Sequence, residues 1–77
     1  MKDPTHYCVQ AYVRRDGRLT AEPVRWCASA RAARDAARRL GRQRPVVVAY
    51  AFEGRPEYGV FGEARLLARH GDLGEAA

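Results

Sequence analysis

The 77-residue sequence has no long hydrophobic run. Its longest apolar stretch runs from Val46 to Phe52, far short of the ~20 residues that a transmembrane helix needs. No apolar segment follows the first six residues, so the sequence also predicts no signal peptide. We therefore expect a cytoplasmic protein that does not enter a membrane.

Cysteine and histidine are scarce, with two residues of each. A disulfide-stabilised domain of this length usually carries more cysteines, so we expect Cys8 and Cys27 to be reduced and apolar in character, with a structural disulfide as the alternative. His6 and Cys8 can share one face of a strand, but a closed zinc site would need Cys27 and His70 to converge on them. No C-x-x-C or H-x-x-x-H spacing is present, and we expect no metal ligand.

Signatures of catalysis are also lacking. The sequence has no glycine-rich phosphate loop, no nucleophile motif and no arrangement of paired carboxylates. Gly54, Gly59 and Gly62 are spaced for turns. Because a chain of this size also has little room for a substrate pocket, we expect no catalytic residue and no cofactor.

Apolar residues are abundant enough for one small folded domain. They make up 47% of the sequence, too much for a disordered chain. A domain this small buries only ~60% of the surface that its unfolded chain exposes, so association with a partner would stabilise it. We predict a single domain over residues 1–77, with an ordered core from about residue 6 to 71 and a frayed tail over 72–77.

A hairpin is predicted at the start of the chain. Apolar and polar residues alternate over residues 6–15, which is the period of a strand. Asp16-Gly17 follows, and this pair favours a type I′ turn, whose two central residues have positive φ. The second strand is predicted over residues 18–25, at a sheet edge, because Pro23 has no N–H to donate.

One helix is predicted over residues 29–42, with Ser29 as its N-cap. Gly41 and Pro45 mark its end. The apolar stripe recurs at helical spacing and consists of Ala33, Ala36, Ala37 and Leu40. Because this stripe is mostly alanine, the helix must lie close against the surface that it covers.

The second half of the chain is predicted to continue the sheet. Residues 46–53 are apolar on both faces, which indicates a central strand that is covered on both sides. A loop follows over residues 53–59. Residues 62–70 fit a short helix or a strand, although an isolated helix of two turns would be marginal.

Two segments of this half carry a resemblance, Val47-Val48-Ala49-Tyr50 and Leu67-Ala68-Arg69-His70-Gly71-Asp72. Together with the opening hairpin, they resemble a set of small uncharacterised bacterial proteins. The resemblance implies an extended closing segment and no particular function. The predicted fold class is therefore α+β, a four-stranded antiparallel sheet in the pattern β-β-α-β-β. Its strand order is 2-1-3-4, through a right-handed crossover, with one Ala/Arg-rich helix on one face.

The net charge of +5 is concentrated in the predicted helix. Residues 28–44 hold six arginines against one acid, which leaves +5, while eight basic and eight acidic residues cancel elsewhere. This face is a candidate for binding nucleic-acid phosphates, through Arg31, Arg34, Arg38 and Arg42. An uncovered sheet face could add base stacking from Tyr7, Tyr12, Tyr50, Phe52 or Tyr58. A solvated face is the alternative, since a GC-rich genome also fills exposed helix positions with arginine.

One thin helix can cover only one face of the predicted sheet, whereas the third strand needs cover on both. We therefore expect a second copy to pack against the open face as an isologous homodimer. The candidate interface residues are Tyr12, Trp26 and Tyr50, for each of which ordinary core packing is the alternative. The predicted function is a non-catalytic protein-interaction or self-associating module. The alternative function is a nucleic-acid-binding accessory protein.

Overall fold

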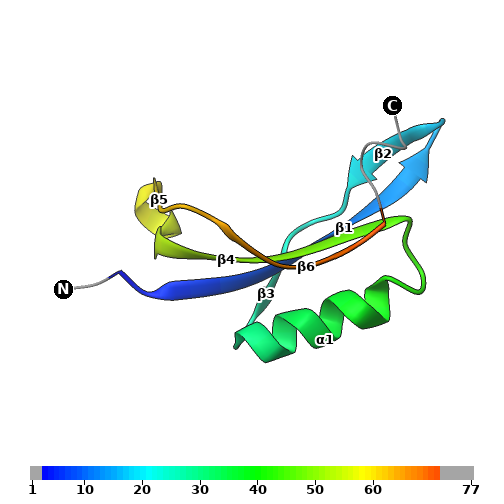
Figure 1. The fold of residues 1–77 in the computed structure, drawn as a ribbon. Coiled ribbons are helices and arrows are strands. Elements are labelled where there is room, and N and C mark those ends of the chain that lie inside the picture. Colours follow the sequence, from blue (N-terminus) through cyan, green and yellow to red (C-terminus); the bar gives the residue numbers. More distant parts are fainter. Residues whose placement is uncertain (1–2, 72–77) are drawn as a thin grey trace.

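The computed structural model describes residues 3–71, which form one helix on one face of a curled antiparallel sheet (Figure 1). The predicted α+β class is confirmed. The predicted frayed tail, residues 72–77, lies outside the described residues.

Two long strands form the centre of the sheet. β1 (Thr5–Arg15) pairs antiparallel with β4 (Val46–Arg55), in a register that runs from Thr5 opposite Glu53 to Tyr12 opposite Val46. β4 has neighbours on both of its edges, so the prediction of a central third strand is confirmed.

The opening hairpin has the predicted turn. β2 (Arg18–Ala21) pairs with the end of β1, and Asp16 and Gly17 have φ angles of 52° and 77°. Positive φ at both positions is the geometry of a type I′ turn, whose twist matches that of the flanking strands.

The predicted second strand is two strands. β2 ends at Ala21, and β3 (Arg25–Cys27) begins after Pro23 and pairs with an earlier part of β1. Between them the Glu22 N–H donates to the Ala11 carbonyl at 2.8 Å, which holds the connection beside β1. Pro23, which cannot donate, lies where the ladder is interrupted.

The other outer edge is also divided. The chain leaves β4 through the short 3-10 helix η1 (Pro56–Tyr58), and both β5 (Val60–Phe61) and β6 (Arg65–His70) pair with β4. The strand interpretation of residues 62–70 is therefore confirmed from Arg65 onward. The prediction of four strands in the order 2-1-3-4 was wrong. The described sheet has six strands on the path β2-β1-β4-β5, with β3 beside β1 and β6 beside β4, because each outer strand is interrupted.

Helix α1 (Ala30–Leu40) covers one face of this sheet (Figure 1). It begins as predicted, because the Ser29 Oγ accepts a hydrogen bond from the Ala32 N–H at 3.0 Å. The core beneath it is built from small side chains, as predicted for an alanine stripe, and consists of Val9, Ala11, Ala33, Ala37, Val47 and Ala49.

Gly41 ends the helix for a different reason from the one that the sequence indicates. Its φ of −60° and ψ of −18° are helical, so no left-handed cap is needed there. A Cβ at this position would lie 2.9 Å from Cγ of His70 on β6. The glycine is therefore explained by the close approach of β6 to the end of the helix.

Candidate interaction surface

The register of the strands divides the side chains between the two faces of the sheet. Val9 and Val47 lie under α1, so the alternate residues of β1 and β4 point to the opposite side, which we call the open face. Trp26 pairs with Cys8, and Leu66 pairs with Tyr50, which places both on the open face as well. Strands β1, β3, β4 and β6 contribute to this face His6, Cys8, Gln10, Tyr12, Arg14, Trp26, Val46, Val48, Tyr50, Phe52, Leu66 and Arg69.

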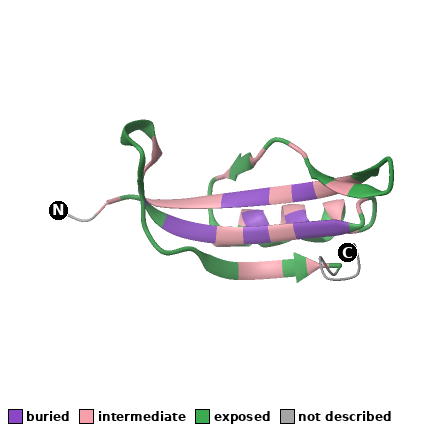
Figure 2. Cartoon of the chain, turned by 90° about the horizontal axis from the view of Figure 1, so that it is seen from above, coloured by how far each residue is buried: buried purple, intermediate pink, exposed green. Residues whose placement is uncertain are grey.

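No element of residues 3–71 covers the open face. Figure 2 looks onto it, with α1 visible behind the strands. The chain also curls away from the helix at both ends of the sheet, at the β2 hairpin and at β5, so the open face is the floor of a trough (Figure 1). On this side neighbouring side chains leave Val46 and Phe52 only 2% and 6% exposed, but within the described chain a second layer of secondary structure covers β4 on the helix side alone.

The three predicted interface residues lie on this one face. Tyr12 and Tyr50 are half-buried, and Trp26 is 60% exposed. Phe61 and Leu66 have similar exposure, at 65% and 63%. Exposed large apolar side chains on one surface mark an interaction site more reliably than scattered ones do. The structure therefore brings the candidate residues together, while their role stays a prediction.

Five rings form a cluster at one end of the open face, which we call the aromatic cluster. It consists of His6, Trp26, Tyr50, Phe52 and Phe61. Phe52 is at its centre, with ring centroids 5.2 Å from His6, 5.7 Å from Phe61, 6.1 Å from Trp26 and 6.3 Å from Tyr50. These distances are those of favourable aromatic pairs, so the cluster orders its own exposed members.

Two polar side chains on the floor of the trough donate hydrogen bonds within the chain. The His6 Nε2 donates to the Gly54 carbonyl at 3.0 Å, and the Gln10 amide donates to the Glu22 carbonyl at 3.0 Å. Neither residue therefore loses its main hydrogen bond when the face is covered. The desolvation free energy lost when a partner covers this face is therefore smaller than it would be if these groups were left without hydrogen bonds.

The residues considered for metal binding do not form a site in the described chain. His6 and Cys8 share the open face, as expected for alternate positions, but Cys27 pairs with Tyr7 and points to the helix side. Burial raises the pKa of the Cys8 thiol, which disfavours the thiolate that binds metal. Within residues 3–71 no group of three or more histidine, cysteine or carboxylate side chains could hold an ion.

A hollow of about 300 Å³ opens beside the aromatic cluster. Its walls are Trp26, Tyr50, Phe52 and Phe61 together with Val24, Gly62 and Ala64, and none of these side chains is charged. The volume is at the lower limit of small-molecule sites. This hollow could admit an apolar side chain of a partner.

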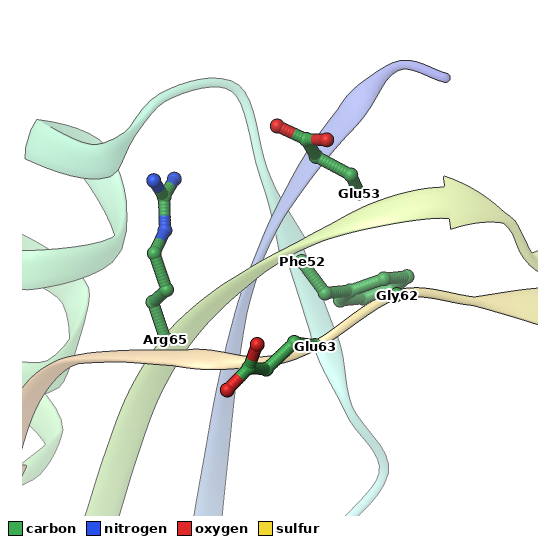
Figure 3. Close-up of a pocket in the computed structure, with 5 residues that line it drawn as sticks. All are labelled: Phe52, Glu53, Gly62, Glu63 and Arg65. Atoms are coloured by element: carbon green, nitrogen blue, oxygen red, sulfur yellow. The ribbon is translucent and has the colours of Figure 1, made fainter. Parts of the chain in front are cut away.

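A second hollow, of about 190 Å³, lies between the end of β4 and the segment before β6 (Figure 3). It is lined by Phe52, Glu53, Gly62, Glu63 and Arg65. Figure 3 shows Glu53 and Arg65 extending in one direction from their strands and Phe52 in another. It is too small for most substrates, which occupy pockets of ~300 Å³ or more.

Some predicted stacking residues lie elsewhere, and some members of the surface were not predicted. Tyr7 packs against the core on the helix side, and Tyr58 lies in η1. Phe61 was missed because it joins the cluster through the two-residue strand β5, and the sequence assigned residues 60–61 to no element. Its only signal in the sequence was the apolar pair Val60-Phe61 between two glycines.

The arginines that are candidates for binding nucleic acid lie on the side of the molecule opposite the open face. Arg31, Arg34, Arg38 and Arg42 are all exposed, as predicted. Within residues 3–71, Arg38 pairs with Asp35 at 2.7 Å, whereas Arg31, Arg34 and Arg42 form no ion pair. The basic surface and the aromatic cluster are therefore separated by the thickness of the sheet and the helix.

Two further findings bear on function. No helix among the described residues has the length and hydropathy that crossing a bilayer requires. No family model, no curated protein sequence and no solved structure matches the chain. The interpretation of the two surfaces therefore depends on the chemistry of their residues.

Proposed function

We propose that the chain is a non-catalytic interaction module that forms a homodimer through its open face. The observation that carries this proposal is an apolar sheet face that no described element covers, with Trp26, Phe61 and Leu66 each more than half exposed. Burial of such side chains stabilises a protein by ~25 cal/mol per Å² of apolar area. The core of this domain is built from valine and alanine, whose small side chains bury little apolar area.

A second copy is the partner that the charge distribution favours. The aromatic cluster and the hollow of about 300 Å³ beside it contain no arginine or carboxylate, and Arg14 and Arg69 lie toward the other end of the open face. Two copies packed face to face place their arginine-rich helices on the outside, about 30 Å apart if each layer is ~10 Å thick. This distance is several times the Debye length of ~8 Å at physiological salt, so the like charges repel weakly.

Packing through the face is favoured over pairing through the edges. β6 is an outer strand in the described sheet, and an antiparallel pair of β6 strands would bring Arg65 and Arg69 of both copies together. Like charges opposite one another destabilise a ladder. The opposite edge contains Pro23 and the interruption between β2 and β3. Both edges thus have features that oppose strand addition.

The size of the face predicts a weak dimer. Four strands at ~4.8 Å spacing and eight residues at ~3.4 Å give a footprint of about 19 by 27 Å, or near 500 Å² in each copy. Two copies cover about 1,000 Å², below the ~1,600 Å² of standard stable complexes. We therefore expect a dissociation constant in the micromolar range.

Sedimentation equilibrium from about 5 to 500 µM tests this proposal. We expect the mass to rise from 8.6 kDa toward twice that value across the series. The variant Trp26→Ser with Phe61→Ser should remain a monomer, because it removes the two exposed rings of the aromatic cluster. Tyr58→Ser is the matched control, since Tyr58 is 76% exposed but lies in η1.

A wild-type chain that stays monomeric at about 500 µM would contradict the proposal. Equal association of the double variant and the wild type would show that another surface is used. Thermal unfolding of each variant verifies that a loss of association is not a loss of folding.

A further inference from the structure

A group of exposed arginines without ion pairs lies on the side of the molecule opposite the open face. Four exposed arginines on or beside α1 form no ion pair within residues 3–71, and these are Arg31, Arg34, Arg39 and Arg42. Two more exposed arginines flank the helix, Arg25 from β3 and Arg65 from β6. We call these six residues the arginine face.

The flanking residues are assigned to this side by the strand register. Arg25 pairs with Val9, and Arg65 pairs with Ala51, so both share the face that α1 covers. Figure 3 shows the guanidinium of Arg65 directed away from its strand. The arginine face therefore extends beyond the helix to both edges of the sheet.

Two other arginines of the same segment are already engaged. Arg44 binds Glu22 with two hydrogen bonds, at 2.7 and 3.3 Å, and both side chains are only 23% exposed. Arg38 contacts Asp35 at 2.7 Å. Arg38 therefore contributes less to binding an anion than the sequence alone indicates, and Arg39 takes its place among the candidates.

We propose that the arginine face binds the phosphate backbone of duplex nucleic acid without reading its sequence. Arg31 and Arg34 lie on α1 and Arg42 lies two residues beyond its end, so at ~1.5 Å per residue the row spans roughly 16 Å along the helix axis. One strand of a duplex presents a phosphate every ~3.4 Å along its axis, so this row can neutralise about three phosphates. Guanidinium groups suit this role, because they donate two parallel hydrogen bonds to a phosphate.

The separation of the two surfaces favours a duplex over a single strand. Binding of a single strand combines a basic groove with aromatic rings on which the bases stack. Here the exposed rings of Trp26 and Phe61 are on the open face, and the arginines are on the other side of the molecule. Tyr7 is on the helix side but is half-buried against the core. A ligand on the arginine face therefore meets charge without a stacking platform.

This inference does not depend on the homodimer. The arginine face and the open face share no residue, so a chain that fails to dimerise retains the arginine face. Variants of one surface accordingly test one proposal and leave the other unaffected.

Fluorescence anisotropy with a labelled duplex of about 20 base pairs tests the inference. Three neutralised phosphates give a slope of about −2.7 in a plot of log Kobs against log salt, which weakens binding about 40-fold between 50 and 200 mM. Duplex DNA and duplex RNA serve as separate probes of the same phosphate chemistry. We expect unrelated duplex sequences to bind with equal affinity.

Two triple variants localise the contact. The helix variant removes the row of arginines and carries Arg31→Gln, Arg34→Gln and Arg42→Gln. The hairpin variant removes three exposed arginines of the hairpin and carries Arg14→Gln, Arg15→Gln and Arg18→Gln. Each lowers the net charge from +5 to +2, because three positive charges are lost. The helix variant should bind more than about 20-fold more weakly at 50 mM salt, and the hairpin variant should lose about threefold or less.

Four outcomes would overturn the inference. These are no duplex binding at 50 mM salt, equal losses in the two triple variants, tighter binding of a single strand than of a duplex, and binding of phosphatidylserine vesicles in preference to either. All substituted arginines are exposed, so the thermal unfolding of both variants should stay within a few degrees of the wild type.

Discussion

Replacing Gly41 by alanine tests the close packing between the end of α1 and β6. The backbone at Gly41 is helical, so alanine can adopt it without strain. The added Cβ would lie 2.9 Å from Cγ and 3.0 Å from Cβ of His70. Both of these atoms are near the backbone of β6, so rotating the imidazole ring does not relieve the contact.

Two opposing terms decide the sign of this substitution. Alanine in place of glycine at a helical position stabilises by up to ~1 kcal/mol. Overpacking of a well-packed site costs ~1–3 kcal/mol. We expect the second term to prevail, with a net loss of about 1 kcal/mol and a midpoint lower by ~4–8 °C in a domain of this size.

Thermal unfolding followed by circular dichroism measures the effect in a double-mutant cycle with His70→Ala. His70→Ala removes the contact with Cγ but keeps the contact with Cβ at 3.0 Å, so Gly41→Ala should lower the midpoint by less in this background than in the wild type. A stabilising Gly41→Ala in the wild-type background would refute the reasoning. Equal destabilisation in both backgrounds would show that His70 is not the cause.

Two further predictions concern the hairpin and its connection to β3. Gly17→Val should destabilise the fold by about 1–2 kcal/mol, because a branched residue resists the φ of 77°, whereas Gly17→Asn should cost less. No atom lies within 4 Å of the added Cβ, so a steric clash would not explain the loss. Equal midpoints for the two variants in thermal unfolding would contradict this account. The hydrogen bond from Arg44 holds the pKa of Glu22 below its ordinary value of 4.5, so this pair stabilises the fold above pH 4.5, and the stabilisation is lost as the pH falls through the lower, folded-state pKa. Urea unfolding of wild type and Glu22→Gln at pH 7 and pH 3 should give a larger stability difference at pH 7, and a difference independent of pH would exclude the pair as its source.

The parts of the fold that depend on local signals could be predicted from the sequence. Asp16-Gly17 determines a turn through its own backbone preferences, and Ser29 caps the helix through a hydrogen bond three residues away. The alanine stripe predicted which face of α1 is buried. Each of these inferences needs only residues close together in the chain.

The interruptions of the outer strands depend on contacts between distant residues. Residues 53–59 have the composition of a loop, yet β4 continues to Arg55, because Gly54 pairs with Phe61 on β5. A side chain at Gly54 would meet the Val60 carbonyl, so this glycine permits a close approach of two strands instead of ending one. Composition alone does not distinguish these two uses of glycine.

The open face was predictable in part. The apolar pattern of residues 46–53 indicated a strand covered on both sides, and the single predicted helix left one face of the sheet without cover, as the described structure has it. The position of Trp26 on that face depends on the register of β3, in which a shift by one residue would turn the side chain toward the helix. The contribution of Phe61 depends on β5, for which the sequence has no strand signal.

A homodimer that also binds nucleic acid should bridge two duplexes. A dimer through the open face places its two arginine faces on opposite outer surfaces, so one dimer would bind two duplexes at once. The bridging should therefore require both surfaces, and the Trp26→Ser, Phe61→Ser variant should bind a single duplex with unchanged intrinsic affinity. Resonance energy transfer between a donor-labelled and an acceptor-labelled duplex would detect the bridge. A monomer has only one arginine face. Energy transfer that persists in this variant would therefore show that bridging does not require the open face.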